Sequence, residues 1–215
     1  DNPLNVTVDK DMNITANFVY DVGERFVRVG EGKFDMGNAS KTKGAEGPSH
    51  EVHLDSFYID KYEITRGIWL QVMNWGKSNG YTFDYTGGNT GSNGQIPPAA
   101  SDDHPVIVNW YDAVKWCNAR SEMESRPPVY YTDAGNNQVY RTGVVDLLDS
   151  MVDWSALGYR LPTEAEWEKA ARGGLDGKSY PNGDTLDDTL AYFDKTLGDT
   201  TTVGQYPANG YGIYD

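Results

Sequence analysis

The chain has 215 residues, enough for one sizeable domain, and 38% hydrophobic and 13% aromatic residues can build a core rich in large rings. A net charge of −14 argues against a nucleic-acid partner, because binding to phosphates needs a positive surface. No stretch approaches 18 consecutive apolar residues, so no membrane-spanning helix is expected, and a single cysteine excludes an internal disulfide.

The first 20 residues predict a β-hairpin. Apolar and polar residues alternate over 4–8 and again over 14–18, with a turn-prone stretch between them. This segment resembles the end of a bacterial surface repeat of the internalin B-repeat type. A two-stranded hairpin is marginally stable alone, so we expect residues 1–20 to be the tail of an upstream repeat. The alternative is an N-terminal hairpin of the main domain. The resemblance implies a location outside a bacterial cell or on its surface.

The main domain is expected to cover residues 21–215 and to begin with four short strands. A helix follows, opening at Thr65 and ending near Gly76, with an apolar stripe along one face. The expected strands cover residues 26–29, 33–37, 51–54 and 57–60.

The second half of the chain mixes helices with long polar loops. A loop is expected over 76–103, a second helix from Asn109, a β-hairpin insertion over 127–145 and a short helix over 164–172. Strands and helices do not alternate as βαβ units, so the predicted class is α+β and loop-rich.

Residues 158–174, GYRLPTEAEWEKAARGG, contain signals for both ends of that short helix. The hydroxyl of Thr163 can cap the first turn while Glu166 reaches back to the Thr163 N–H, which is a capping box. Trp167 is expected to anchor a narrow apolar face. Gly173 is expected to end the helix in the left-handed conformation.

Arg160, just before the cap, is expected to pair with an interior acid such as Asp112, and contact with a ligand is the alternative. Glu164 and Glu168 share one helix face, but we expect them to be exposed rather than an acid–base pair. The histidines are expected to be structural, since His50 and His53 would point to opposite faces of a strand. The tryptophans on helices are expected in the core, namely Trp69, Trp110, Trp116 and Trp167.

The motif at 158–174 resembles the central motif of the formylglycine-generating enzyme (sulfatase-modifying factor) family. Residues 34–37, 46–52, 55–65, 104–113 with Cys117, and 203–215 agree with further family motifs in the same order. The resemblance implies a formylglycine-generating-enzyme-like fold, which is C-type-lectin-like. It also implies a link to the oxidation of a sulfatase cysteine to formylglycine, which uses oxygen, copper and two cysteines.

Two departures from the family bear on this activity. Both family cysteines would lie beyond Asp215, after a Gly-Asn-x-Trp-Glu-Trp motif, whereas Cys117 belongs to the second-helix motif. The domain is therefore expected to be C-terminally incomplete and inactive as it stands. No catalytic or cofactor-binding residue is assigned, and copper is expected only with a downstream cysteine pair.

Calcium is the other cofactor that the resemblance implies. Tyr192 stands where the family has an asparagine ligand, so Asp194 and Asp199 are the remaining calcium candidates.

Two functional hypotheses stay open. One is a formylglycine-generating-enzyme-like domain of a bacterial secreted or surface protein. The other is a non-catalytic module on the same fold that binds a protein, a peptide or a glycan. A structural adhesin unit ranks below both.

Overall fold

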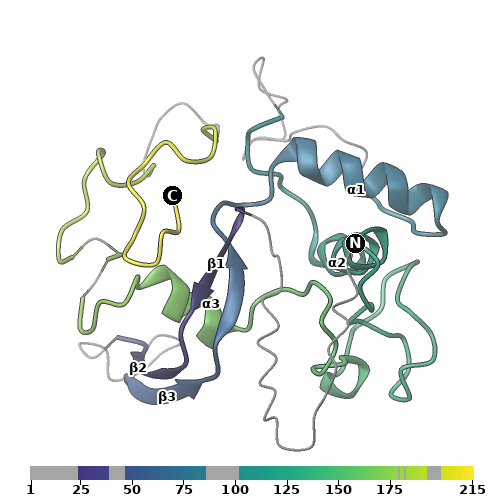
Figure 1. Cartoon of the computed structure of the whole chain (residues 1–215), viewed down its shortest axis with the longest axis horizontal. Coiled ribbons are helices and arrows are strands. Elements are labelled where there is room, and N and C mark those ends of the chain that lie inside the picture. Colours follow the sequence, from purple (N-terminus) through teal and green to yellow (C-terminus); the bar gives the residue numbers. More distant parts are fainter. Residues whose placement is uncertain (1–23, 39–46, 86–101, 179, 182, 193–199) are drawn as a thin grey trace, which may run out of the picture.

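The computed structural model describes residues 24–38, 47–85, 102–178, 180–181, 183–192 and 200–215 (Figure 1). The hairpin expected over residues 1–20 and the calcium candidates Asp194 and Asp199 lie outside these ranges. The described elements are β1 (Phe26–Val29), β2 (Gly32–Met36), β3 (His50–Leu54), β4 (Phe57–Asp60), α1 (Arg66–Ser78), α2 (Trp110–Met123), a single 3-10 turn (Asp149–Met151) and α3 (Glu164–Ala171). Short helices and small antiparallel sheets joined by long loops confirm the α+β class. None of the helices in the described ranges is long and apolar enough to cross a membrane.

The four strands form one antiparallel ribbon with a break in the middle. β1 pairs with β4 and β2 pairs with β3. The chain therefore runs along one side of the ribbon through β1 and β2 and returns along the other side through β3 and β4. The two ladders share one register, because Val29 lies opposite Phe57 and Gly32 lies opposite Leu54. Residues 30–31 therefore stand opposite 55–56, where the ladder is interrupted. The sequence predicted the strands but did not determine this pairing.

A lysine of α3 holds the ribbon at its break. The Nζ of Lys169 donates hydrogen bonds of 2.9 Å to the carbonyl oxygens of both Gly30 and Gly32. Lys169 is 5% exposed, and α3 packs against β2 and β3. A buried ammonium needs hydrogen-bond partners to offset its lost hydration, and the break in the ladder supplies them. Lys169 thus sets the position of α3 on the ribbon.

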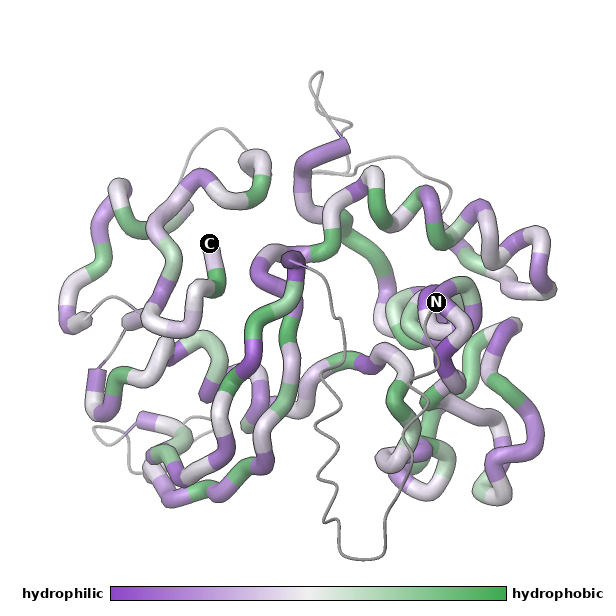
Figure 2. The backbone as a smooth tube through the Cα atoms, viewed as in Figure 1, coloured by the Kyte–Doolittle hydropathy of each residue, from purple (hydrophilic) through white to green (hydrophobic). Residues whose placement is uncertain are grey.

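Both long helices begin at the predicted residues. Thr65 caps α1 and Asn109 caps α2, each by accepting a hydrogen bond from the backbone N–H three residues on. The helices pack on one another, with the rings of Trp69 and Trp116 stacked 5.5 Å apart. Every residue from 114 to 121 is buried, so α2 is the central helix of the main core. Figure 2 shows the apolar residues in short runs over both halves of the molecule.

The segment over 127–145 is held by α2 more than by strand pairing. Only isolated bridges form there among the described residues, including Tyr131 with Val139, instead of the predicted hairpin strands. The side chain of Asn118 is fully buried and bonds the segment at both its ends. Its Oδ1 accepts from the N–H groups of Val129 and Tyr130, and its Nδ2 donates to the carbonyls of Tyr130 and Tyr140.

Two of the four helix tryptophans are not in the core. Trp69 and Trp116 are buried as expected, but Trp110 is 48% and Trp167 is 61% exposed. The expected Trp167 anchor of α3 is therefore wrong. The buried residues of α3 are Glu166, Lys169 and Ala170. Glu166 bonds Arg160, and Lys169 bonds the ribbon carbonyls, so the helix face that carries these two residues lies inward. Trp167, next to Glu166 in the chain, therefore points to solvent.

Candidate functional site: an aromatic groove beside the capped helix

The central motif forms a compact ion pair at the start of α3. Two nitrogens of Arg160 each donate a 2.6 Å hydrogen bond to one oxygen of the Glu166 carboxylate. The same carboxylate accepts from the Thr163 N–H at 2.8 Å, while the Thr163 hydroxyl accepts from the Glu166 N–H. The predicted capping box is thus confirmed. The Glu166 carboxylate of this capping box also balances the charge of Arg160.

The expectation that Arg160 pairs with Asp112 is wrong. Asp112 is fully buried in the first turn of α2 and lies 3.0 Å from the Nζ of Lys115, which is also buried. Its two oxygens accept from the N–H groups of Asp84 and Tyr85. Asp112 already has a cation and two hydrogen-bond donors beside it, and Arg160 forms its ion pair with Glu166 instead.

Next to this pair lies an open groove of about 330 Å³. Three of its residues are large, apolar and well exposed: Trp110 at 48%, Trp154 at 52% and Leu148 at 61%. Its walls come from the start of α2, from the segment 147–154 and from the residues just before α3. The groove is lined by Trp110, Tyr130, Leu147, Leu148, Asp149, Val152, Trp154, Leu161, Pro162 and Thr163.

Hydrogen bonds join the walls of the groove. The hydroxyl of Tyr111 donates to Asp146 at 2.7 Å and so ties α2 to the segment that carries Leu147 and Leu148. On the other side, the Leu161 N–H donates to the Tyr130 hydroxyl at 2.9 Å. These bonds hold the segments that form the groove together.

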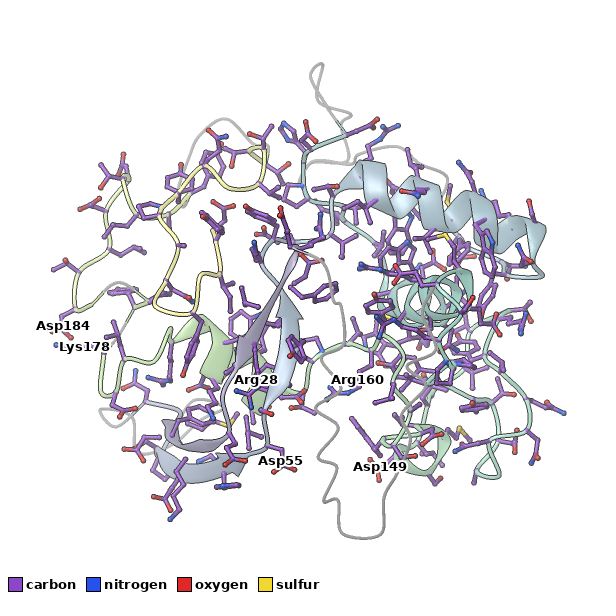
Figure 3. The ribbon with its side chains drawn as sticks, viewed as in Figure 1. Arg28, Asp55, Asp149, Arg160, Lys178 and Asp184 are labelled. Atoms are coloured by element: carbon purple, nitrogen blue, oxygen red, sulfur yellow. The ribbon has the colours of Figure 1, made fainter. Side chains whose placement is uncertain are left out.

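Trp154 connects the groove to the central motif. Its indole N–H donates to Asp149 at 3.0 Å, and the guanidinium of Arg160 lies 5.3 Å from its ring centroid. Figure 3 shows Arg160 in the segment that runs between the helical half and the β half, with Asp149 on the helical side. Arg160, which Glu166 orients, therefore contacts the ring of Trp154.

The groove is suited to binding more than to bond-breaking chemistry. The described residues that line it include no cysteine, histidine, lysine or serine. Burial raises the pKa of the Tyr130 phenol, so this hydroxyl stays protonated. The groove instead offers two indole rings, leucine side chains and the carboxylate of Asp149, which is the composition of a ligand-binding surface.

The far end of α3 positions the last segment of the chain. Gly173 follows the helix with φ +61°, which confirms its predicted role as the helix stop. Asn209 donates from its amide to the carbonyls of Ala170 and Ala171, the last residues of α3. A Cβ on Gly173 would lie 2.8 Å from Asn209 Cβ and from the Gly210 nitrogen. The glycine therefore permits close docking of residues 209–213 on the helix (Figure 1).

The described residues provide little for a metal. Within the described ranges, no three histidine, cysteine, aspartate or glutamate side chains come together as a metal site. His50 and His53 are exposed on β3, as expected for structural histidines. Glu164 is exposed as expected, but the expectation is wrong for Glu168, which is half-buried, pairs with Arg172 and accepts a hydrogen bond from the Gly37 N–H. Asp194 and Asp199 stay a prediction.

Cys117 lies inside the core of α2. Its residue is 6% exposed, and burial raises the pKa of its thiol to about 12. A thiol in this state is neither a nucleophile nor a metal ligand near neutral pH, since both roles need the thiolate.

Comparison with known proteins decides the family. The model of the sulfatase-modifying factor enzyme 1-like domain matches residues 17–215. The chain belongs to this family. The family predicted from the central motif is therefore confirmed.

Individual relatives agree with this assignment. A chaperone protein LppX from Paenibacillus barcinonensis is 33% identical over 83% of this chain and 65% of its own length. A formylglycine-generating enzyme from Thermomonospora curvata is 29% identical over 95% of this chain and 72% of its own. The crystal structure of CarF is 28% identical and superimposes with a TM-score of 0.68 over 88% of this chain and 75% of that one. The chain thus spans about two thirds of the length of the two sequence relatives.

The groove itself was not predicted from the sequence. Its signal was a stretch with five large apolar residues among the eight of 147–154, between the expected insertion and the central motif. Such a run predicts burial as readily as exposure. Only the fold shows that Leu148 and Trp154 stay open to solvent.

Proposed function

We propose that this chain is a formylglycine-generating-enzyme-like domain of a bacterial secreted or surface protein whose own residues bind a ligand and do not oxidise cysteine. The observation that carries this proposal is the burial of Cys117. Copper chemistry of the family type needs accessible thiolates, because Cu(I) is a soft ion. The only cysteine of these 215 residues is a buried neutral thiol in α2, so the residues present do not fit copper.

Ligand binding is the role that the exposed groove supports. Trp110, Leu148 and Trp154 expose apolar surface in one concave place, and such surfaces mark interaction sites in soluble proteins. The name of the LppX relative, a chaperone, agrees with a protein partner. A peptide or a glycan would also use aromatic side chains.

The second candidate function is the cysteine oxidation of the family, with thiols from residues that follow Asp215. It is favoured by the hydrogen bonds of Asn209 to the end of α3. These bonds hold residues 209–213 against the helix and would position any segment that follows them. For this second candidate we also propose that Asp194 and Asp199 bind calcium. The surface location rests on the resemblance of residues 1–20 to a bacterial repeat.

One experiment separates the two functions. The 215-residue chain is incubated with Cu(I), oxygen, a thiol reductant and a peptide that contains one cysteine, and aldehyde is measured by mass spectrometry after hydrazide capture. We expect no aldehyde and no stoichiometric copper, with the Cys117→Ala variant behaving alike. Aldehyde from the chain alone would refute the proposal. Aldehyde only from the complete gene product would establish the second candidate.

A further inference from the structure

We propose that the groove binds a basic and apolar segment of a partner polypeptide. This inference rests on the proposed binding function and names its ligand class. The groove residues that matter are Trp110, Trp154 and Leu148 for the apolar contacts and Asp149 for the cationic ones.

The apolar half of the inference follows from exposed area. Two indoles and a leucine, one from α2 and two from the segment 147–154, stay about half exposed or more around one hollow. Covering exposed apolar area of this kind with the side chains of a partner is favourable, because it removes that area from water. Buried tryptophans are also the side chains that most often dominate binding energy at protein interfaces. Leucine, valine or phenylalanine side chains of a partner would fill this space.

The charge of the partner follows from the acids around the groove. Residues 142–165 contain four acids and one base, and that base, Arg160, is already neutralised by Glu166. The four acids are Asp146, Asp149, Asp153 and Glu164. Asp149 lines the groove, and each of the other three acids is next in the chain to a lining residue, so this acidic rim carries excess negative charge, which attracts cations and repels acidic segments.

Asp149 is the acid placed to meet a cation from the partner. It is exposed, and its Oδ1 accepts the indole N–H of Trp154. Among the described residues, no lysine or arginine forms an ion pair with it. A lysine or arginine beside a partner's apolar side chain would reach Asp149 while that side chain rests on Trp154.

Three other ligand classes are less well matched. A neutral oligosaccharide would use the indoles but would gain nothing from the acidic rim. A nucleic acid would be repelled by that rim and by the net charge of −14. An anionic peptide would face the same repulsion. The combination of open indoles with unneutralised carboxylates favours a basic and apolar polypeptide.

The test uses the 215-residue chain and three 12-residue peptides followed by tryptophan fluorescence and calorimetry. The first peptide alternates lysine with leucine, the second replaces every lysine by glutamate, and the third replaces every leucine by serine. We expect only the lysine–leucine peptide to bind with 1:1 stoichiometry. Its affinity should fall several-fold between 50 and 300 mM NaCl, because salt screens exposed charges.

Groove variants locate the binding. Trp110→Ala and Trp154→Ala should each weaken the lysine–leucine peptide about tenfold or more, as interface tryptophans do. Asp149→Asn should weaken it about three- to fivefold at low salt and less at high salt. The matched controls are Tyr180→Ala and Asp184→Asn, both in the loop after α3, and Figure 3 shows Asp184 on the far side of the molecule from Asp149. Unchanged thermal melting checks that each variant folds.

The outcomes are distinguishable. Equal binding of the glutamate–leucine peptide would overturn the basic ligand class but leave the binding function standing. Binding of cellohexaose that is lost in Trp154→Ala would overturn the polypeptide class and also leave the binding function standing. Binding to neither peptides nor the sugar would overturn the inference and remove the support that the groove gives to the binding function. Equal losses in the control variants would place the site elsewhere.

Discussion

Arg160 and Glu166 form a two-bond ion pair, with 2.6 Å between each donor nitrogen and its carboxylate oxygen. The pair links the two features that distinguish this domain. Glu166 closes the capping box of α3, and Arg160 lies against the Trp154 ring at the groove. The sequence motif that identifies the family therefore also supports the wall of the candidate binding site.

Removing the acid of this pair should destabilise the fold. Glu166→Ala deletes two hydrogen bonds to Arg160 and one to Thr163, and it leaves a half-buried guanidinium without its counter-charge. We expect a loss of about 2–3 kcal/mol in the free energy of unfolding, measured by urea denaturation. Glu164→Ala, an exposed change in the same helical turn, should cost about 0.5 kcal/mol or less. Equal losses in the two variants would show that the pair contributes nothing.

The stabilisation from Glu166 should depend on pH. Burial disfavours ionisation of this carboxyl, but the hydrogen bonds from Arg160 and Thr163 outweigh it and hold the pKa of Glu166 below its ordinary value of 4.5. A lowered pKa in the folded state means that the stabilisation is complete above pH 4.5. It is lost as the pH falls through the folded-state pKa.

The stability difference between the unsubstituted chain and Glu166→Gln should therefore be constant near neutral pH and shrink in acid. Urea melts at a series of pH values measure it. The comparison with the variant is needed because burial raises the pKa of Asp60, which shifts stability with pH in the opposite direction. A difference that grows on acidification would contradict the assignment.

Two glycines with similar backbone angles should respond differently to alanine. Gly173 and Gly177 have φ values of +61° and +66°, so alanine at either place meets the same left-handed penalty of about 1 kcal/mol. A Cβ on Gly177 would meet nothing within 4 Å, whereas one on Gly173 would collide with Asn209 and Gly210. Gly173→Ala should cost roughly 2 kcal/mol more in unfolding free energy. Hydrogen exchange should also rise in residues 209–213 in that variant alone.

The thiol of Cys117 should be inert in the folded chain. Because it is buried and its pKa is raised to about 12, a disulfide reagent such as DTNB at pH 8 should label almost no protein over an hour. In 6 M guanidinium chloride the same reagent should label one thiol per chain. Rapid stoichiometric labelling of the folded protein would undermine the argument that Cys117 takes no part in redox chemistry.

Local signals in the sequence were reliable. Thr65, Asn109 and Thr163 cap their helices, and Gly173 ends α3, as predicted. Each of these contacts joins residues within four positions of one another, so the chain needs no distant partner to specify it. The family could be recognised from the same segment, since its residues are contiguous.

Tertiary contacts decided the features that bear on function. Arg160 had several possible acids, and only the fold brought Glu166 to it while Lys115 neutralised Asp112. Trp167 was expected to be buried from its helical spacing, but the polar partners of Glu166 and Lys169 selected another face of α3.

The sequence by itself thus determined the family, the helix ends and the presence of the strands, because these depend on contiguous residues and local hydrogen bonds. The structure alone decided how the strands pair, which tryptophans stay in solvent and where the groove lies. Those outcomes depend on which groups, distant in the chain, pair with a buried charge or cover an apolar ring. The choice among these groups is made only when the tertiary structure brings the segments into contact.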